Sequence, residues 1–220
     1  AATDQATDTP TNNFATMNPL DNYFAGSAFS EGNCKIVTTN GNITYNTSTI
    51  GFSSGKWYME TKLAGSAGYT VGVVRGVATA NDNDNKLGNR ADGWSYDDGG
   101  NVENNGGSLT FSGASYSSGD IIGVYADLDN NELYFSKDGA LQNSGTGLAL
   151  TAGTYFFAVG DNNASASSTY EVNFGNPVSA LSSAVSDGDY GAFEFSTTIT
   201  GDSVSKTFKA LNTKNLAEYG

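Results

Sequence analysis

The sequence contains no histidine, a single cysteine, three prolines and only ten basic residues among its 220 positions. Without histidine, Ser-His-Asp and Cys-His catalysis, His-ligated zinc and the usual proton shuttle are all excluded. With Cys34 as the one thiol, no intrachain disulfide can form, so stability has to come from burial of a core. No apolar run approaches the roughly 20 residues of a membrane span, and no membrane insertion is predicted.

The sequence has 23 acidic residues against these ten basic ones, which gives a formal net charge of −13. Phosphate binding depends on clustered Lys and Arg, so no nucleic-acid partner is predicted. No glycine-rich loop is followed by Lys-Ser or Lys-Thr, and no cofactor is predicted. The acidic excess favours solubility at high local concentration, and cation binding in acidic loops is the alternative.

Glycine, tyrosine and phenylalanine are abundant, with 28, 12 and 12 residues. Runs of alternating apolar and polar residues, separated by Gly, Ser and Asn turns, predict many short strands and little helix. The predicted strands cover residues 35–38, 43–45, 57–63, 69–75, 109–111, 121–128, 133–137, 154–159 and 169–174. This spacing predicts an all-β fold of two antiparallel sheets packed as a sandwich.

The run at residues 57–63 predicts which side of one strand faces the core. Trp57, Met59 and Leu63 share one face and should point inward, while the opposite face carries Tyr58, Glu60 and Lys62. Trp57 is therefore predicted to be a core residue.

Four motifs occur in order along the chain: GKWYME at residues 55–60, GWSYDDGGN at 93–101, the paired runs at 119–139 and YEVNFG at 170–175. Together they resemble a SPRY domain over roughly residues 30–177. The resemblance implies an antiparallel two-sheet SPRY-type β-sandwich that acts as a non-enzymatic binding module and grips protein or glycan with loops. The predicted organisation is an arm or linker at residues 1–30, the sandwich at 31–177, and a C-terminal extension at 178–220 with a possible extra hairpin turning near Gly201 and Asp202.

Function in such a module is expected in the loops. The candidates chosen by position are Arg75, Asp82, Asp84, Arg90, Trp94, Tyr96, Asp97, Asp98, Tyr116, Asp161 and Asn162. Trp94 belongs to a scaffold motif, so packing in the core competes with exposure to a ligand. Arg75 can either pair with Asp82 or Asp84 or face a ligand, and pairing is favoured.

The flanking sequences, at residues 8–19 and 208–216, resemble those that bracket such domains in bacteriophage virion proteins. They contain apolar residues in segments too short to form a core of their own. These residues are predicted to attach to the sandwich edge or to a neighbouring subunit, and they are Phe14, Met17, Leu20, Phe208, Leu211, Leu216 and Tyr219.

The acidic stretch from Asp127 to Glu132 contains three carboxylates, which are candidates for catalysis or for calcium binding. A glycoside hydrolase needs two acids about 5 to 10 Å apart across a cleft, but Asn130 and Asn131 favour a turn here. Asp127, Asp129 and Asn131, and separately residues 81–85, offer oxygen ligands for calcium. A solvated turn is the favoured interpretation of both segments, and no metal site is predicted.

Three hypotheses follow. The first is a non-enzymatic virion protein of a tailed phage, such as a capsid decoration, fibre or tail component on the particle surface, which contacts other virion proteins or copies of itself. The second is a lectin-like adhesion module for host-surface glycan or protein, and the third is a glycan hydrolase on the same architecture.

Overall fold

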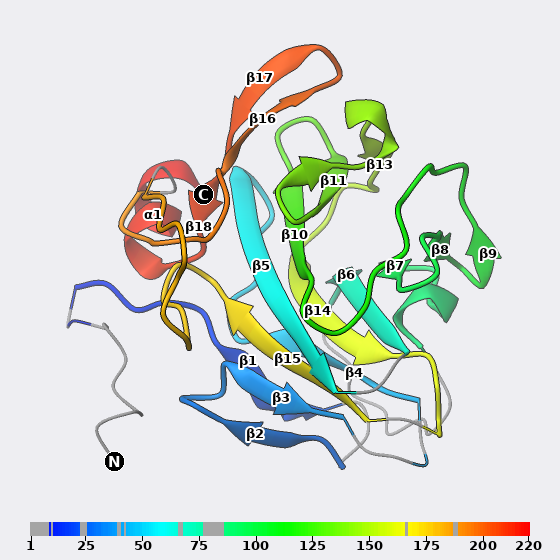
Figure 1. Ribbon diagram of the computed structural model, residues 1–220. Coiled ribbons are helices and arrows are strands. Elements are labelled where there is room, and N and C mark those ends of the chain that lie inside the picture. Colours follow the sequence, from blue (N-terminus) through cyan, green and yellow to red (C-terminus); the bar gives the residue numbers. More distant parts are fainter. Residues whose placement is uncertain are drawn as a thin grey trace.

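Two antiparallel sheets face each other in the structure, a computed structural model that describes residues 9, 11–22, 26–38, 41, 43–65, 68–76, 86–165, 167–186 and 189–220 (Figure 1). The first sheet runs in the order β1 (Met17–Asn22), β4 (Tyr45–Ser48), β14 (Tyr155–Asp161), β6 (Tyr69–Arg75), β7 (Gly93–Asp97), β8 (Val102–Asn104), β9 (Gly107–Ser108). The second runs in the order β12 (Ala140–Leu141), β11 (Glu132–Lys137), β10 (Ile121–Asp127), β5 (Lys56–Gly65), β15 (Ser168–Asn173), β3 (Lys35–Val37), β2 (Ala28–Ser30). The predicted two-sheet antiparallel sandwich is therefore confirmed.

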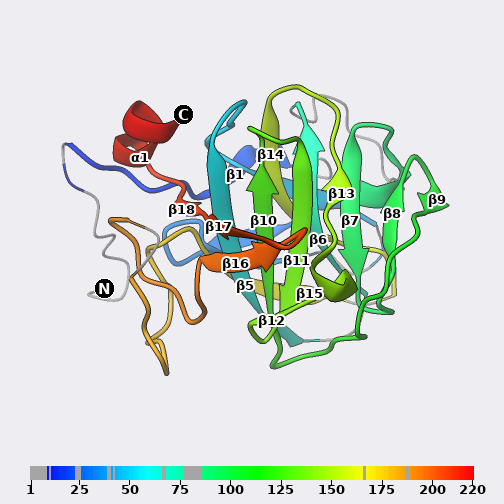
Figure 2. The same ribbon diagram turned by 90° about the horizontal axis from the view of Figure 1, so that it is seen from above.

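Three additions extend the second sheet and its surroundings. A short strand β13 (Leu148–Ala149) pairs with β11, and β18 (Lys209–Ala210) pairs in parallel with β5. A separate hairpin of β16 (Thr198–Gly201) and β17 (Val204–Thr207) lies across this sheet (Figure 2). The C-terminal extension thus contains a hairpin, and its turn at Asp202 and Ser203, which both have positive φ, lies next to the turn expected near Gly201 and Asp202.

The core between the sheets follows the strand alternation. Trp57, Met59 and Leu63 are almost fully buried in it, as predicted from the period of two. Phe52 packs against both Trp57 and Phe157, with ring centroids 6.3 and 4.9 Å apart. These aromatic contacts connect the two sheets near one end of β5.

Most of the opposite face of β5 is buried as well, which the alternation did not predict, and Lys62 at its far end stays exposed. Tyr58 and Glu60 are at most 3% exposed, because the C-terminal extension covers this face. Phe208 lies 5.2 Å from Tyr125, and Phe193 lies 4.8 Å from Tyr58, measured between ring centroids. The result is a second apolar cluster outside the sandwich proper.

Helical structure is minor in the described residues. Two 3-10 turns, η1 (Leu87–Asn89) and η2 (Asn143–Gly145), lie in loops, and one helix, α1 (Thr213–Tyr219), ends the chain. Asn212 caps α1, because its side chain accepts a hydrogen bond from the Asn215 amide at 2.8 Å. None of the described helices has the length and apolar character needed to cross a membrane.

One predicted strand, at residues 109–111, is not a strand. The short strand β9 ends at Ser108, and Leu109 and Phe111 instead pack their side chains against the core as partly buried residues. Their apolar character therefore reflects packing, without the ladder pairing that the alternation suggested.

Candidate functional site

The acidic stretch from Asp127 to Glu132 forms the turn between β10 and β11, as predicted, because Asp127 and Glu132 are register partners. Asn131 has a φ of 56°, which Asn tolerates better than most residues. The Asn130 amide and side chain donate to the Asp127 carboxylate at 3.1 and 2.8 Å. Asp127 thereby closes its own turn.

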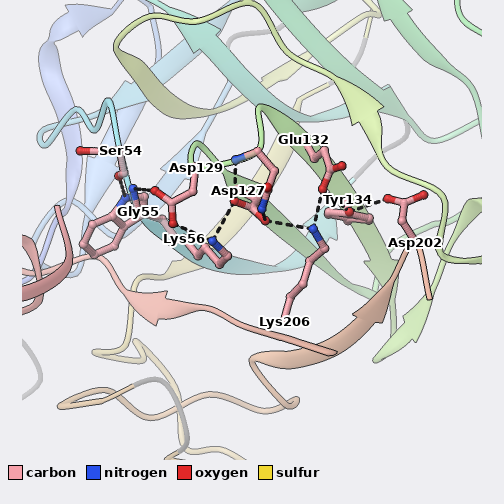
Figure 3. A network of polar contacts seen from close by, with 11 residues as sticks. Ser54, Gly55, Lys56, Asp127, Asp129, Glu132, Tyr134, Asp202 and Lys206 are labelled. Atoms are coloured by element: carbon pink, nitrogen blue, oxygen red, sulfur yellow. Dashed lines mark hydrogen bonds and ion pairs between the residues drawn. The ribbon is translucent and has the colours of Figure 1, made fainter. Parts of the chain in front are cut away.

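Two lysines converge on Asp127, whose side chain is fully buried (Figure 3). Lys56 approaches Oδ1 at 3.1 Å and Lys206, from β17, approaches Oδ2 at 3.1 Å. Burial alone would raise the pKa of Asp127, but hydrogen bonds from Asn130 and the two lysines outweigh it and lower the pKa. The carboxylate is therefore ionised and fully paired at neutral pH.

The network continues from Lys206 to the turn of the C-terminal hairpin (Figure 3). Lys206 Nζ lies 2.6 Å from Glu132 Oε2, and Tyr134 Oη lies 2.6 Å from one carboxylate oxygen each of Glu132 and Asp202. Burial together with these two carboxylates raises the pKa of Tyr134, so the phenol keeps the proton that it donates. These contacts fasten β17 to the outer face of the second sheet.

This arrangement suits attachment of the hairpin and does not suit acid–base catalysis. A general acid needs a raised pKa and an open cleft, whereas Asp127 is buried with a lowered pKa. The two carboxylates proposed as calcium ligands, Asp127 and Asp129, are both paired with Lys56. Asp129 Oδ2 lies 2.6 Å from Lys56 Nζ, and its Oδ1 accepts a hydrogen bond from the Gly55 amide at 2.8 Å. Across the described part of the chain, no three Asp, Glu, His or Cys side chains are grouped as a metal ion would require.

The residues predicted to lie in ligand-binding loops are found at two opposite ends of the first sheet. Arg75 pairs with Tyr155 at one end of β6, whereas Asp161 pairs with Tyr69 at the other. Six residue steps of about 3.3 Å separate these ends by about 20 Å. No single ligand-sized site therefore contains the whole predicted set.

At the Arg75 end, the exposed groups are fixed by neighbours. Arg90 forms a two-pronged ion pair with Asp92, with distances of 2.8 and 3.0 Å. The Arg75 guanidinium, which is exposed, lies 3.4 Å from the Ala152 carbonyl. Its predicted partners, Asp82 and Asp84, lie outside the described residues. Trp94 is only 5% exposed and packs on Tyr155, so its ring belongs to the core.

At the other end, the predicted side chains hold turns together. The Asp97 carboxylate accepts from the Asn101 amide at 2.9 Å, and Asp98 accepts from the Gly68 amide at 2.7 Å. Tyr116 donates to the Tyr96 carbonyl at 2.6 Å.

Tyr96, Asp97, Tyr116 and Asp161 are all at most 7% exposed, which corrects the expectation that their side chains face a ligand. Only Asp98 and Asn162 of this group are partly exposed. Burial raises the pKa of Asp161 to about 6, although the amide of Thr44 donates to its Oδ1 at 3.2 Å.

The predicted attachment residues mostly dock on the sandwich of the same chain. Met17, Phe208 and Leu211 are fully buried and Phe14 is 8% exposed. Leu216 packs partly buried against the main core. Leu20, 95% exposed, and Tyr219, 38% exposed, are the two attachment residues left open to a neighbour.

Sequence reasoning missed the lysines that pair with Asp127. Lys56 and Lys206 lie 71 and 79 residues from it, and no local pattern links such positions. The hairpin prediction around Gly201 was the one signal that placed Lys206 near a sheet.

Comparisons with known proteins agree with this architecture. The SPRY domain family model matches residues 56–177, more than half of the chain. The SPRY domain of human HERC1 superposes with a TM-score of 0.60 at 19% identity, covering 71% of this chain and 96% of that one. The TRIM65 PSpry domain gives 0.52 at 14% identity, covering 72% and 89%.

Stonustoxin gives a TM-score of 0.53 at 20% identity, covering 73% of this chain but only 27% of the toxin chain. A search of curated proteins found no match. At these identities the solved structures establish the fold, and the family model establishes the family. The chain belongs to the SPRY domain family, whose members are protein-binding modules.

Proposed function

We propose that this protein is a non-enzymatic binding module displayed on the surface of a bacteriophage particle. The phage setting is supported by the flanking sequences, which resemble those around such domains in virion proteins. In this role the partners are other virion proteins or further copies of the chain, and host-surface protein or glycan is the ligand of the exposed loops.

One observation carries the proposal: the terminal segments and the open loops lie on opposite sides of the sandwich. Figures 1 and 2 show β18 and α1 on one side, and β8 and β9 on the other. Phe14 bridges to Asn212, so both terminal segments meet on the first side. Such a module can be anchored through its termini while η1 and the β8–β9 turn face outward.

Site-specific labelling of intact particles tests this orientation. Cys34 is 5% exposed and should stay unreactive, so introduced thiols report selectively. Arg75→Cys should react with a membrane-impermeant maleimide on intact particles, whereas Tyr219→Cys should react only after the particles are dissociated.

Two results would contradict the proposal. The first is absence of the polypeptide from purified particles. The second is equal labelling of both positions on intact particles, which would show that the terminal side is not the attached one.

Catalysis is tested separately with purified protein and bacterial polysaccharides. We expect no depolymerisation, because histidine is absent and the clustered acids of the β10–β11 turn are paired with lysines. Cleavage that is lost in Asp129→Asn without unfolding would favour the hydrolase hypothesis instead.

A further inference from the structure

A pocket of about 250 Å³ lies on the outer face of the second sheet, beyond the point where the C-terminal hairpin covers it. Its floor is formed by β5, β10 and β15, and its walls by residues 177–182 together with Glu194 and Phe195. The pocket is on a different face from the loops that the sequence predicted, and it draws on the extension beyond the SPRY match.

The walls are held in place by hydrogen bonds to the floor and to each other. Ser179 Oγ donates to Glu171 at 2.9 Å, and the amides of Ser182 and Ser183 donate to Glu194 at 2.7 and 2.9 Å. The Glu194 amide in turn donates to the buried Glu60 at 2.7 Å. The pocket is therefore preformed, which reduces the entropy lost on binding.

Lys62 is the basic residue in the lining of this pocket, and its charge helps to lower the pKa of Glu171 beside it, although the two form no ion pair within 4 Å. Seven of the ten basic residues form ion pairs with acids in the described parts of the chain, and Lys62, Arg75 and Lys214 do not. Lys62 lies between Ile121 of β10 and Glu171 of β15 in the ladder, with its side chain exposed. Its ammonium group can offer three hydrogen bonds to an incoming anion.

Glu171 and Glu194 in the pocket can accept more hydrogen bonds than they do in the structure. Glu171 binds Lys35 and Ser179 with one contact per oxygen, and Glu194 likewise receives one amide hydrogen on each oxygen. Each ionised carboxylate can accept about four hydrogen bonds. Hydroxyl donors of a ligand can therefore be satisfied here without displacing the existing contacts.

Apolar side chains complete the lining. Ile121, Pro177, Leu181 and Phe195 are all partly exposed around the polar groups. Such a surface suits the C–H face of a ring, which is apolar while its rim carries hydroxyl groups.

We propose that this pocket binds one carboxylate-bearing sugar unit, of the uronic acid type, at the end or within a surface glycan. Lys62 pairs with the sugar carboxylate, Glu171 and Glu194 accept its hydroxyl hydrogens, and Phe195 and Ile121 contact its apolar face. The inference rests on the proposed role as a binding module, places a ligand in this pocket and outside the exposed loops, and does not depend on the location of the protein in a particle.

A sugar fits these groups better than an acidic peptide does. An Asp or Glu side chain supplies a carboxylate for Lys62 but no hydroxyl donors for the two glutamates. A peptide has backbone amides to donate to Glu171 and Glu194, but they are not held on the same rigid ring as the carboxylate, so repulsion between the three carboxylates is less well offset than with a sugar.

The test compares methyl β-D-glucuronide with methyl β-D-glucoside, which differ in the carboxylate alone, by titration of backbone amide resonances. The glucuronide should shift amides at residues 119–121 and 178–182, and bind at least tenfold more tightly than the glucoside. Lys62→Met should lower the glucuronide affinity to the level of the glucoside. Lys214→Met removes the same charge outside the pocket and should change nothing.

Several results would overturn the proposal: no shifts at the pocket, equal affinity for both glycosides, or an unchanged affinity in Lys62→Met that melts like the wild type. Equal shifts with sodium acetate would indicate a simple anion site, and stronger binding of N-acetylglutamate amide would indicate a peptide site. The titration uses the isolated protein. If it shows no binding of the glucuronide, the proposed display on a phage particle is still tested separately by the labelling of particles.

Discussion

Asp161 carries a carboxylate that the fold buries without a basic partner among the described residues. Its side chain is fully buried, and its contacts are with neutral donors, the Thr44 amide and the Thr38 hydroxyl. Burial raises its pKa from 3.8 to about 6. The folded state therefore binds the proton more tightly than the unfolded state, and this residue lowers stability progressively as pH rises from about 4 to about 6.

Asp161→Asn should be more stable than the wild type at pH 7.5 by up to about 3 kcal/mol, since the penalty for ionisation is removed. Urea unfolding at pH 4.5 and 7.5 measures this, and the gain should shrink at the lower pH. Asp138→Asn, at an exposed turn, is the control. Equal stability of Asp161→Asn and the wild type at both pH values would contradict this prediction, because it would show that other contacts offset the cost of ionising the buried carboxylate.

Lys206 joins the C-terminal hairpin to the β10–β11 turn through ion pairs with Asp127 and Glu132. Lys206→Met leaves the buried Asp127 with Lys56 alone and should destabilise the protein by about 3 kcal/mol in urea unfolding. Because the pKa of Asp127 is lowered, the stabilisation it brings is present above pH 3.8 and is lost as pH falls further.

Lys209→Met is the matched control for Lys206→Met. The side chain of its partner Asp189 is 40% exposed, so Lys209→Met should lower the free energy of unfolding by less than about 1 kcal/mol. Similar losses in the two variants would mean that burial of the pair does not matter.

Among the elements, β5 is covered on its inner face and over most of its outer face, as are its neighbours β10 and β11. The main core packs on one face, and the C-terminal extension packs on the other through Phe193 and Phe208. Removal of residues 178–220 should expose Tyr58, Tyr125 and Tyr134 and leave Asp127 without Lys206. We expect this fragment to lose its cooperative melting transition and to bind a hydrophobic dye. A fragment that melts like the full chain would show that the extension is dispensable.

The strand β1 makes the N-terminal segment part of the first sheet. Met17 pairs with Ser48, and Ala15 and Met17 lie in the main core. Deletion of residues 1–20 should therefore lower the melting temperature by several degrees, because a loss of about 1 kcal/mol shifts it by roughly 2–8 °C. Deletion of residues 1–8 is the matched control and should leave melting unchanged. An equal melting temperature for both deletions would restore the interpretation of an independent arm.

At the scale of the whole molecule, the net charge of −13 opposes compaction through self-repulsion. Added salt screens exposed charges within about 10 Å at 0.1 M, so melting temperature should rise with NaCl. Calcium should stabilise no more than NaCl of the same ionic strength, because Asp127 and Asp129 already hold Lys56. A calcium-specific increase of many degrees, reversed by a chelator, would reveal a true calcium site.

Local patterns were sufficient to predict the sandwich from the spacing of its short strands, and the inward position of Trp57 from the alternation at residues 57–63. The Asn-rich turn after Asp127 and the Gly-Asp turn at residue 201 also follow from local backbone preferences. These features depend only on neighbours in the chain, which is why patterns predict them.

The accessibility of the predicted loop residues could not be predicted from local patterns. Trp94, Tyr96, Tyr116 and Asp161 are polar or aromatic residues near loops, and their burial depends on elements far away in the chain. The same holds for Lys206, which meets Asp127 across 79 residues, and for the pocket around Lys62, whose walls come from the extension. Local periodicity assigns a residue to a face of its strand, but what covers that face depends on long-range packing, which the alternation cannot specify.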